Sequence, residues 1–225
     1  MENGRKKYST IGCCGIDCGL CPRFHTKGDS ACPGCCGLNF REKHPSCGFV
    51  TCCVAKKELE ICSEYKEYPC SRFDPEKEGY DSFVTHKKVF ANLDFIKNNG
   101  IENFIKQQNK RIGILTTLLA NYDDGRSKNF FCLSCALLPL DKPQETRDCI
   151  NNQSNPLNVK EQNKKLKENL KMIAGALKID LKLNSKKTPG HDTAFFVALP
   201  HRDGFNAGGF HFFQHSVNAF QVCLF

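Results

Sequence analysis

The chain has 225 residues, of which 40% are hydrophobic and 25% charged, and its formal net charge is +8. This length allows one ordinary domain, or a small domain next to a helical one. No apolar run is long enough to cross a bilayer, and the basic residues within 1–7 precede no apolar stretch, which argues against a membrane protein and a secretory signal. The sequence therefore predicts a cytoplasmic protein.

Cysteine is the most unusual part of the composition. Sixteen are present, and twelve of them lie between Cys13 and Cys70. The other four are Cys132, Cys135, Cys149 and Cys223. In a secreted chain this density would indicate a disulfide scaffold, but in a reducing compartment thiolates are soft ligands for zinc or iron. The predicted location therefore favours metal sites over disulfides.

The positive charge gives weak support for nucleic acid as a partner. A zinc ion with four thiolates carries a net charge of about −2, so two such sites would lower the total to about +4. Much of the lysine lies in the predicted helix 159–178, where a solvated helix face is the ordinary explanation. We therefore expect a protein partner rather than nucleic acid or a membrane, and no small-molecule substrate is identifiable from the sequence.

Composition divides the chain into three parts. Residues 8–75 are rich in cysteine, glycine and proline and lack hydrophobic periodicity, so bound metal is expected to hold this domain together. Residues 84–186 carry helical patterns, and residues 187–225 form an atypical tail. The expected fold class is a small irregular cysteine-rich metal-bound domain followed by a mainly α-helical domain, with little β structure.

Apolar spacing predicts the elements of the helical part. Residues 101–122 carry one stripe, made of Ile101, Ile105, Gln108, Ile112, Leu115, Leu119 and Tyr122. Ser127 is expected to cap the next helix, and Asn155-Pro156 to begin another. The stripe of that last helix is Val159, Leu166, Leu170, Ile173 and Leu177. Residues 179–183 alternate between apolar and polar side chains, which predicts a short strand.

The tail after Lys187 differs from the rest of the chain. It contains neither lysine nor glutamate, and phenylalanine is crowded in it. Four of the seven histidines lie there: His191, His201, His211 and His215. No regular spacing organises these histidines, so a disordered or foreign tail, or an aromatic docking segment, fits them better than a metal-binding tract.

The cysteine spacing provides nine candidate metal ligands. The first three form a C-x3-C-x2-C cluster, and Cys32-Pro-Gly-Cys35 is the kind of knuckle that supplies half of a zinc site. The nine candidates are Cys14, Cys18, Cys21, Cys32, Cys35, Cys47, Cys52, Cys62 and Cys70. Cys13, Cys36 and Cys53 directly adjoin other cysteines, whose side chains point apart, and we interpret them as small buried apolar residues.

Two metal chemistries stay open for these ligands. A C-x3-C-x2-C run also holds the cluster of radical-SAM enzymes, but the alternating strands and helices of their barrel do not follow it here. The compact cysteine run of bacterial ferredoxins is absent too. Structural zinc agrees with the knuckle and the wide spacings, and it explains how a core-poor segment folds. Zinc is the expected cofactor, and an iron–sulfur cluster is the alternative.

Several motifs occur together across residues 8–186. They are Ile11-Gly-Cys-Cys-Gly-Ile-Asp-Cys-Gly-Leu-Cys-Pro22, Cys32-Pro-Gly-Cys35, His44-Pro-Ser-Cys47, Thr51-Cys-Cys53, Tyr68-Pro-Cys70-Ser-Arg-Phe73, Gly100-Ile-Glu-Asn-Phe-Ile105 and Asp124-Gly-Arg-Ser-Lys128. Together they resemble one prokaryotic family, the cysteine-rich domain of unknown function 3795. The resemblance implies that the repeated cysteines bind metal, and it implies no activity. The family usually has a C-x2-C before Tyr-Pro-Cys, whereas here Tyr65 stands where the second cysteine is expected.

No catalytic constellation is visible, because a Walker loop, a dinucleotide fingerprint and a nucleophile elbow are all missing from the sequence. We interpret residues 124–128 as a capped helix–helix turn rather than an anion site, and His25 as a loop residue rather than a fourth ligand. The sequence favours a binding or adaptor protein with structural zinc sites. The alternative is an iron–sulfur redox or sensing protein, and enzymatic activity is left open.

Overall fold

The computed structural model describes residues 6–73, 81–151 and 158–184. The predicted tail, residues 187–225, lies outside this part, and so does the expected helix start at Asn155-Pro156. Across the described residues the fold is mostly helical and contains no β-strand. The expected helical character and low β content are therefore confirmed for this part of the chain.

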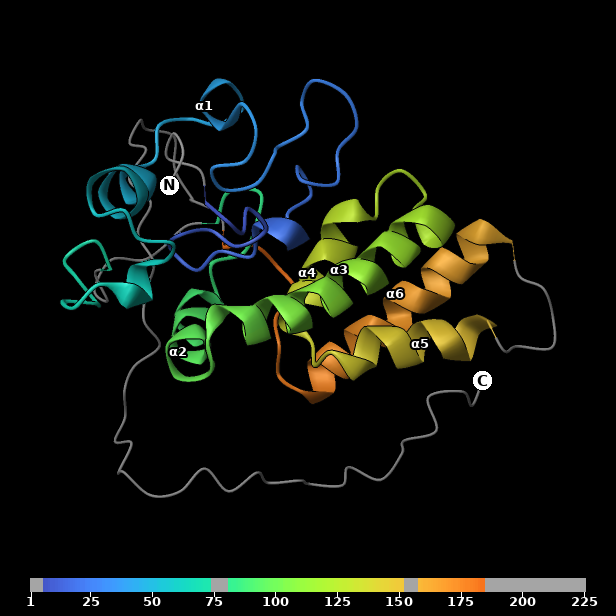
Figure 1. Cartoon of the computed structure of the whole chain (residues 1–225). Coiled ribbons are helices and arrows are strands. Elements are labelled where there is room, and N and C mark those ends of the chain that lie inside the picture. The colour runs from blue at the N-terminus through green and yellow to red at the C-terminus, as the bar shows by residue number, and fades with distance from the viewer. Residues whose placement is uncertain (1–5, 74–80, 152–157, 185–225) are drawn as a thin grey trace, which may run out of the picture.

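The cysteine-rich segment, residues 6–73, is built from short helical turns joined by irregular chain. The turns are the 3₁₀ helix η2 (Cys18–Leu20), α1 (Phe40–Lys43), the π-helical η3 (Val50–Lys56) and the 3₁₀ helix η4 (Cys62–Glu64). Elements this short are not stable alone, so contacts between them must hold the segment together. In Figure 1 most of this segment lies at one end of the molecule, whereas η2 lies against α3 and α4.

Five longer helices lie in the rest of the described chain. They are α2 (Val89–Asn99), α3 (Ile101–Tyr122), α4 (Lys128–Leu137), α5 (Asp141–Asn151) and α6 (Val159–Ala176). α3 is the longest, and it contacts α2, α4, α5 and α6. Figure 1 shows α3 crossing the middle of the molecule, with α5 and α6 side by side at the end away from the cysteine-rich segment.

Gly100 separates α2 from α3. Its φ is +83°, a conformation that L side chains rarely adopt, and its N–H donates to the Ile96 carbonyl at 2.8 Å. α2 therefore ends at this glycine, and α3 begins at the next residue with a changed direction. The change of direction lets the two helices pack against each other.

α3 has the predicted bounds, but its buried face differs in part from the predicted stripe. Gln108, Leu115 and Tyr122 are buried as expected. Phe104 and Leu118 are buried as well. Four predicted members are only partly buried: Ile101, Ile105, Ile112 and Leu119. The reason is that α2 contacts the helix near its start, whereas α4, α5 and α6 contact it elsewhere, so the buried face changes along its length.

Two aspartates close the turn between α3 and α4. Asp123 Oδ1 accepts hydrogen bonds from the N–H groups of Gly125 at 3.0 Å and Ser127 at 3.1 Å. Asp124 Oδ1 accepts from the Arg126 N–H at 3.0 Å and from the Ser127 hydroxyl at 2.7 Å. These carboxylates occupy backbone donors that an anion would need, which agrees with a helix–helix turn. The expected cap does not form, because the Ser127 hydroxyl donates to Asp124 and the Ser127 side chain makes no hydrogen bond to the first turn of α4.

α6 begins with a reciprocal pair of hydrogen bonds. Asn158 Oδ1 accepts from the Glu161 N–H at 3.0 Å, and Glu161 Oε2 accepts from the Asn158 N–H at 3.1 Å. Leu166 and Leu170 are fully buried, as predicted, whereas Val159 is 52% exposed. Leu177, the last member of the predicted stripe, is 42% exposed and follows the helix. The predicted stripe is therefore correct in the middle of the helix and wrong at its first and last residues, which lie beyond the packed core.

The strand predicted at 179–183 does not form, because no neighbouring strand lies beside it in the described structure. Apolar residues of this segment pack against the helical core as irregular chain. Lys87 Nζ donates hydrogen bonds to the carbonyls of Asp180 at 3.0 Å and Lys182 at 2.8 Å. A side chain therefore satisfies the carbonyls that a strand partner would otherwise bind.

Two clusters of buried side chains form the core. The first combines cysteines and apolar residues of 6–73 with Val89, Leu93 and Ile96 of α2. The second fills the space between α3, α4, α5 and α6. Leu20 of η2 belongs to this second cluster and is 1% exposed. The cysteine-rich segment therefore packs against the helices at two places.

Asp17 joins the cysteine-rich segment to two helices by hydrogen bonds. Its carboxylate is buried and accepts from Asn92 Nδ2 of α2 at 2.9 Å and from Gln108 Nε2 of α3 at 2.9 Å. Both amides also donate to backbone carbonyls of the cysteine-rich segment. These bonds fix the loop that carries the first cysteines relative to α2 and α3.

We expect Asp17→Ala to lower the free energy of unfolding by about 2 kcal/mol, because it removes an acceptor from each of two buried amides. Equilibrium denaturation followed by circular dichroism measures this. The control is Asp94→Ala at an exposed position of α2, with an expected loss below about 0.5 kcal/mol. Equal losses in the two variants would contradict the role given to the Asp17 hydrogen bonds.

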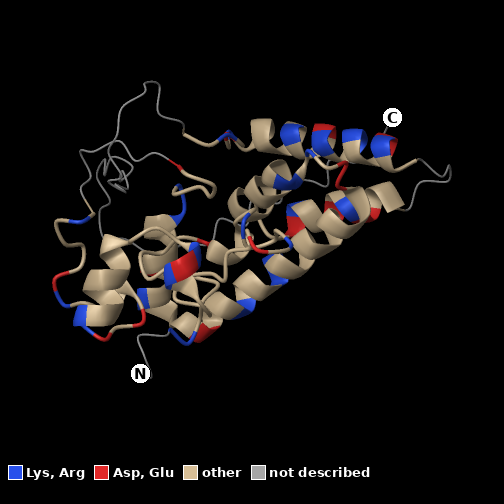
Figure 2. Cartoon of the chain, turned by 90° about the horizontal axis from the view of Figure 1, so that it is seen from above, with Lys and Arg blue, Asp and Glu red and all other residues tan. Residues whose placement is uncertain are grey.

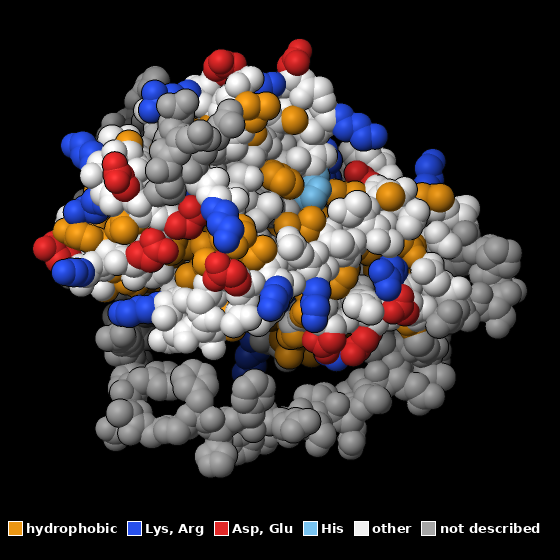
Figure 3. All heavy atoms as spheres, in the orientation of Figure 1, with side chains coloured by type: hydrophobic (Ala, Val, Ile, Leu, Met, Phe, Trp, Pro, Cys, Tyr) orange, Lys and Arg blue, Asp and Glu red, His pale blue; other side chains and the backbone are white. Residues whose placement is uncertain are grey.

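Charges of both signs are distributed over the surface. In Figure 2 basic residues are spread along the helices with acidic residues between them. The face in Figure 3 shows the same mixture, with apolar side chains between the charges. None of the described helices combines the length and the apolar character that a membrane crossing requires.

Candidate metal centre

Three buried thiols lie close together in the cysteine-rich segment. The Sγ atoms of Cys13, Cys53 and Cys62 all lie within 4.8 Å of one another, and the three residues are 1%, 2% and 9% exposed. No other trio of His, Cys, Asp or Glu ligand atoms in the described residues is this close. Zinc bound to four thiolates at 2.3 Å places the sulfur atoms about 3.8 Å apart, so small shifts would bring these three into its coordination sphere.

Cys35 contacts Cys13 of this trio, although its Sγ is not among those that all lie within 4.8 Å of one another. Its Sγ accepts a hydrogen bond from the backbone N–H of Cys13 at 3.5 Å, and its side chain also hydrogen-bonds with the Cys13 thiol. Like the other three residues it is buried. The four side chains together offer the number of sulfur ligands that a tetrahedral zinc ion takes. We refer to Cys13, Cys35, Cys53 and Cys62 as the thiol cluster.

Backbone contacts fix the segments that carry the cluster. The Cys62 N–H donates to the Cys13 carbonyl at 2.8 Å, and the Cys35 N–H donates to the Ser9 carbonyl at 2.8 Å. Gly34 has a φ of +80°, and a Cβ at this position would lie 2.3 Å from the Ser9 carbonyl oxygen. Glycine is therefore required for the knuckle to approach the chain before Cys13.

Hydrogen bonds within the cluster favour the thiolate form at two positions. Contacts from Cys13 and Cys62 lower the pKa of Cys53 to about 4. Contacts from Cys13 and Cys36 lower the pKa of Cys35 well below its usual range. Hydrogen bonds with Cys35, Cys53 and Cys62 raise the pKa of Cys13 in turn. Thiols and thiolates in contact share protons, which a bound metal ion replaces.

A buried cation lies beside the cluster. The Lys6 side chain is fully buried, and its Nζ forms an ion pair with Glu60 Oε1 at 3.0 Å. Glu60 also accepts hydrogen bonds from the backbone N–H groups of Lys7 and Tyr8, both at 2.9 Å. Burial lowers the pKa of Lys6, but the charges of Cys35 and Glu60 raise it overall. Lys6 therefore stays charged and offsets negative charge at the cluster.

A cavity of about 290 Å³ adjoins the thiol cluster. The cysteines in its wall are Cys13, Cys14, Cys18, Cys21, Cys32, Cys35 and Cys47. Arg23 and apolar side chains, among them Phe49 and Phe83, complete the wall. We refer to this space as the cysteine cavity. Cys13 and Cys35 belong both to its wall and to the thiol cluster, so the two features are neighbours.

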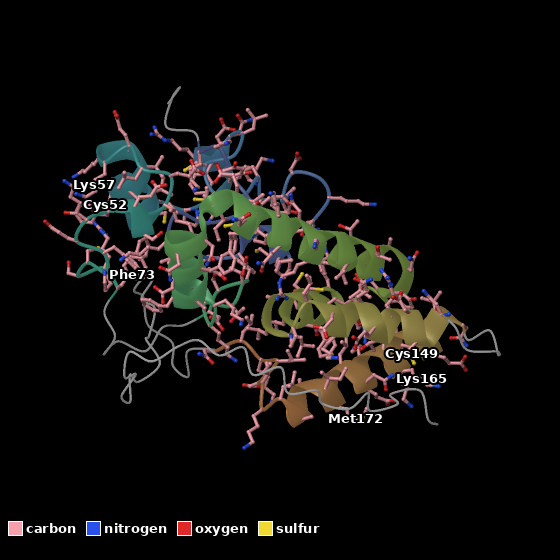
Figure 4. The ribbon with its side chains drawn as sticks, turned by 60° about the horizontal axis from the view of Figure 1, so that its bottom comes forward. Cys52, Lys57, Phe73, Cys149, Lys165 and Met172 are labelled. Atoms are coloured by element: carbon pink, nitrogen blue, oxygen red, sulfur yellow. The ribbon has the colours of Figure 1, made fainter. Side chains whose placement is uncertain are left out.

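A smaller cavity of about 20 Å³ has Cys52, Cys53, Cys62 and Cys70 in its wall. Tyr65, which replaces the expected family cysteine, lines the same cavity. Its hydroxyl donates to Glu67 Oε2 at 2.7 Å, and Lys57 Nζ lies 3.6 Å from its ring centroid. Figure 4 shows Cys52 of η3 close to Lys57, the residue that follows η3, with Phe73 nearer to α2. The Tyr65 side chain therefore lines the same small cavity as these four cysteines.

The structure places the nine sequence-predicted ligands in two groups. Six line the cysteine cavity: Cys14, Cys18, Cys21, Cys32, Cys35 and Cys47. Three line the smaller cavity: Cys52, Cys62 and Cys70. The expected knuckle divides between two places, because Cys35 belongs to the thiol cluster and Cys32 lies only on the cavity wall.

The sequence interpretation of Cys13 and Cys53 as ordinary buried residues misses their place in the thiol cluster. Adjacent side chains point apart, so a Cys-Cys pair can direct its two thiols to different places. Cys14 and Cys52 line the two cavities, whereas their neighbours belong to the cluster. The repeated pairs, which include residues 35–36, are the signal from which this division could have been inferred.

Two other sequence features lie away from the cluster. His25 Nε2 is 2.8 Å from the Gly19 carbonyl oxygen, a contact that agrees with its interpretation as a loop residue. Cys132 and Cys135 of α4 are buried in the helical core. Burial raises the pKa of Cys135 to about 12, so this thiol stays protonated.

A scan against protein-family models, a search of curated proteins and a search of solved structures found no match to this chain. The resemblance to the domain of unknown function 3795 over residues 8–186 therefore stays a prediction. Functional inference consequently starts from the geometry of the thiols.

Proposed function

We propose that this chain is a metal-binding protein in which one zinc ion, held by the thiol cluster, stabilises the fold. The observation that carries the proposal is the closeness of three buried Sγ atoms, all within 4.8 Å of one another. Thiolates are preferred zinc ligands, and four protein ligands leave no coordination position for a substrate. The proposed role of the ion is therefore structural.

The positions of the ligands along the chain support a structural role. Cys53 and Cys62 of the cluster belong to η3 and η4, whereas Cys13 and Cys35 belong to separate stretches of irregular chain. Structural zinc contributes roughly 10 kcal/mol or more in small metal-binding domains. That contribution is as large as the whole stability of a typical domain, which is about 5–15 kcal/mol. One ion can therefore determine whether this segment folds.

The surroundings of the cluster also fit a charged metal site. Zinc with four thiolates carries a net charge of about −2, which is costly to bury without compensation. Lys6 supplies a buried positive charge near Cys35, and Glu60 holds it in place. This arrangement lowers the cost of burying the site.

A zinc site of this kind fits a protein that acts through its folded surface. In this proposal the cysteine-rich segment presents that surface to a protein partner. Leu38 of this segment is 64% exposed, and Phe83, which follows the segment along the chain, is 57% exposed. Both are large apolar side chains available for contact with a partner.

The test is zinc content after removal of one cluster thiol. We expect Cys53→Ala to reduce zinc from about one to well below half an equivalent per chain, because three thiolates bind zinc much more weakly than four. Cys135→Ala removes a buried thiol that lies outside the cluster, and it should retain the full amount. Elemental analysis of both purified proteins gives the result. Equal zinc content in the two variants would contradict the assignment.

A further inference from the structure

The cysteine cavity offers more space than one metal ion needs. Its volume of about 290 Å³ is roughly twenty times the space that holds one water molecule. A single zinc ion instead draws four sulfur atoms to about 3.8 Å from one another and leaves no cavity between them. A metal centre that occupies this space must therefore bring further atoms of its own.

Five thiols in the cavity wall do not belong to the thiol cluster: Cys14, Cys18, Cys21, Cys32 and Cys47. Among the described residues, no three of these five have Sγ atoms within 4.8 Å of one another. The five thiols thus line one common space, and no three of them meet at a single point in it.

Backbone hydrogen bonds fix the chain that carries three of these thiols. The Gly12 N–H donates to the Ile16 carbonyl at 2.7 Å, and the Cys21 N–H donates to the Cys18 carbonyl at 3.1 Å. The positions of Cys14, Cys18 and Cys21 in the cavity wall are therefore set by the fold of this loop.

We propose that an iron–sulfur cluster occupies the cysteine cavity, with its four protein ligands drawn from Cys14, Cys18, Cys21, Cys32 and Cys47. The inorganic sulfide of such a cluster bridges the iron atoms and fills the space between the ligands. Several zinc ions bridged by cysteine thiolates would bring no sulfide of their own, so protein side chains would have to fill the space instead. Arg23 in the wall supplies positive charge beside the anionic centre.

The iron–sulfur proposal shares one assumption with the proposed function, namely that thiolates of this chain bind metal. It uses five thiols that the zinc site does not use. Cys18, Cys32 and Cys47 are half-buried, so one side of the cluster faces the protein surface. Exposure of this kind makes a cluster accessible to electron exchange and sensitive to oxygen, which requires purification without oxygen.

The experiment measures iron, acid-labile sulfide and zinc in the full chain. The protein is purified without oxygen and then incubated with an iron salt, sulfide and a thiol reductant. We expect a brown protein with broad visible absorbance and up to about four iron and four sulfide per chain. Cys21→Ala should lower iron and sulfide to less than about half while zinc stays unchanged, because the ligands are separate.

Three further variants separate this proposal from the zinc site. Cys53→Ala should lose zinc and retain iron and sulfide, and Cys135→Ala should retain all three. Cys32→Ala, at a half-buried position, repeats the Cys21 test if that variant folds poorly by circular dichroism. A wild-type protein that stays colourless after incubation would overturn the cluster. The same holds if Cys21→Ala and Cys32→Ala release zinc instead of iron and sulfide.

Discussion

Removal of zinc is expected to unfold residues 6–73 while α4, α5 and α6 stay folded. In the proposed function one ion joins η3, η4 and the irregular chain around Cys13 and Cys35, so its loss would remove roughly 10 kcal/mol from the stability of that segment. The far ends of the helices keep their own buried cluster, in which Leu118, Leu166 and Leu170 are fully buried. Hydrogen exchange followed by mass spectrometry, before and after treatment with a zinc chelator, resolves the two regions.

The expected pattern is rapid exchange within 6–73 and nearly unchanged protection in α4 and α6. Addition of zinc to the stripped protein should restore protection, which excludes irreversible damage by the chelator. If the cysteine-rich segment keeps its protection without zinc, packing against the helices is sufficient to hold it. That result would contradict the proposed structural role of the ion.

The second large effect is expected in the helical core. Leu118 of α3 is fully buried, so we expect Leu118→Ala to lower the free energy of unfolding by about 4 kcal/mol through lost burial and a residual cavity. Leu177 follows α6 and is 42% exposed, so Leu177→Ala should cost less than about 1 kcal/mol. Chemical denaturation of the zinc-loaded protein measures both. Similar losses in the two variants would contradict the assigned core.

Zinc content should stay the same in both leucine variants, because neither residue contacts the thiol cluster. This comparison separates the stability of the helical core from occupancy of the metal site. A Leu118→Ala protein that folds but lacks zinc would mean that the helices control metal binding more strongly than the direct contacts through Leu20 and Asp17 indicate.

α3, α4 and α6 were predictable because their signals are local, whereas α2 and α5 were expected only as part of a helical region. The bounds of α3 follow from its apolar periodicity, and the helix ends where Asp123 adopts an extended backbone. Its buried face was predicted less well, since Phe104 and Leu118 are buried by neighbours that sequence spacing does not reveal. The prediction of a strand at 179–183 was wrong for a related reason. Alternation predicts an extended chain, but a strand also needs a partner, and Lys87 takes that place here.

The sequence indicates the chemistry of the candidate metal site but not which thiols belong to it. Cysteine density and the absence of other folding signals indicate thiolate ligands in residues 8–75, yet spacing alone does not determine which thiols meet. Cys13 and Cys53 are buried close to Cys62 because irregular turns bring distant segments together. Spacing did not reveal these two thiols as candidate ligands, because the sequence analysis had already assigned that role to their neighbours Cys14 and Cys52.

The central claim is that the thiol cluster holds one zinc ion. X-ray absorption at the zinc edge of the purified full chain, combined with its zinc content, tests this most directly. The account predicts about one zinc per chain, with four sulfur ligands at about 2.3 Å, and loss of this signal in Cys53→Ala but not in Cys135→Ala. A wild-type protein without zinc, or a zinc ion bound mainly by nitrogen or oxygen, would contradict it.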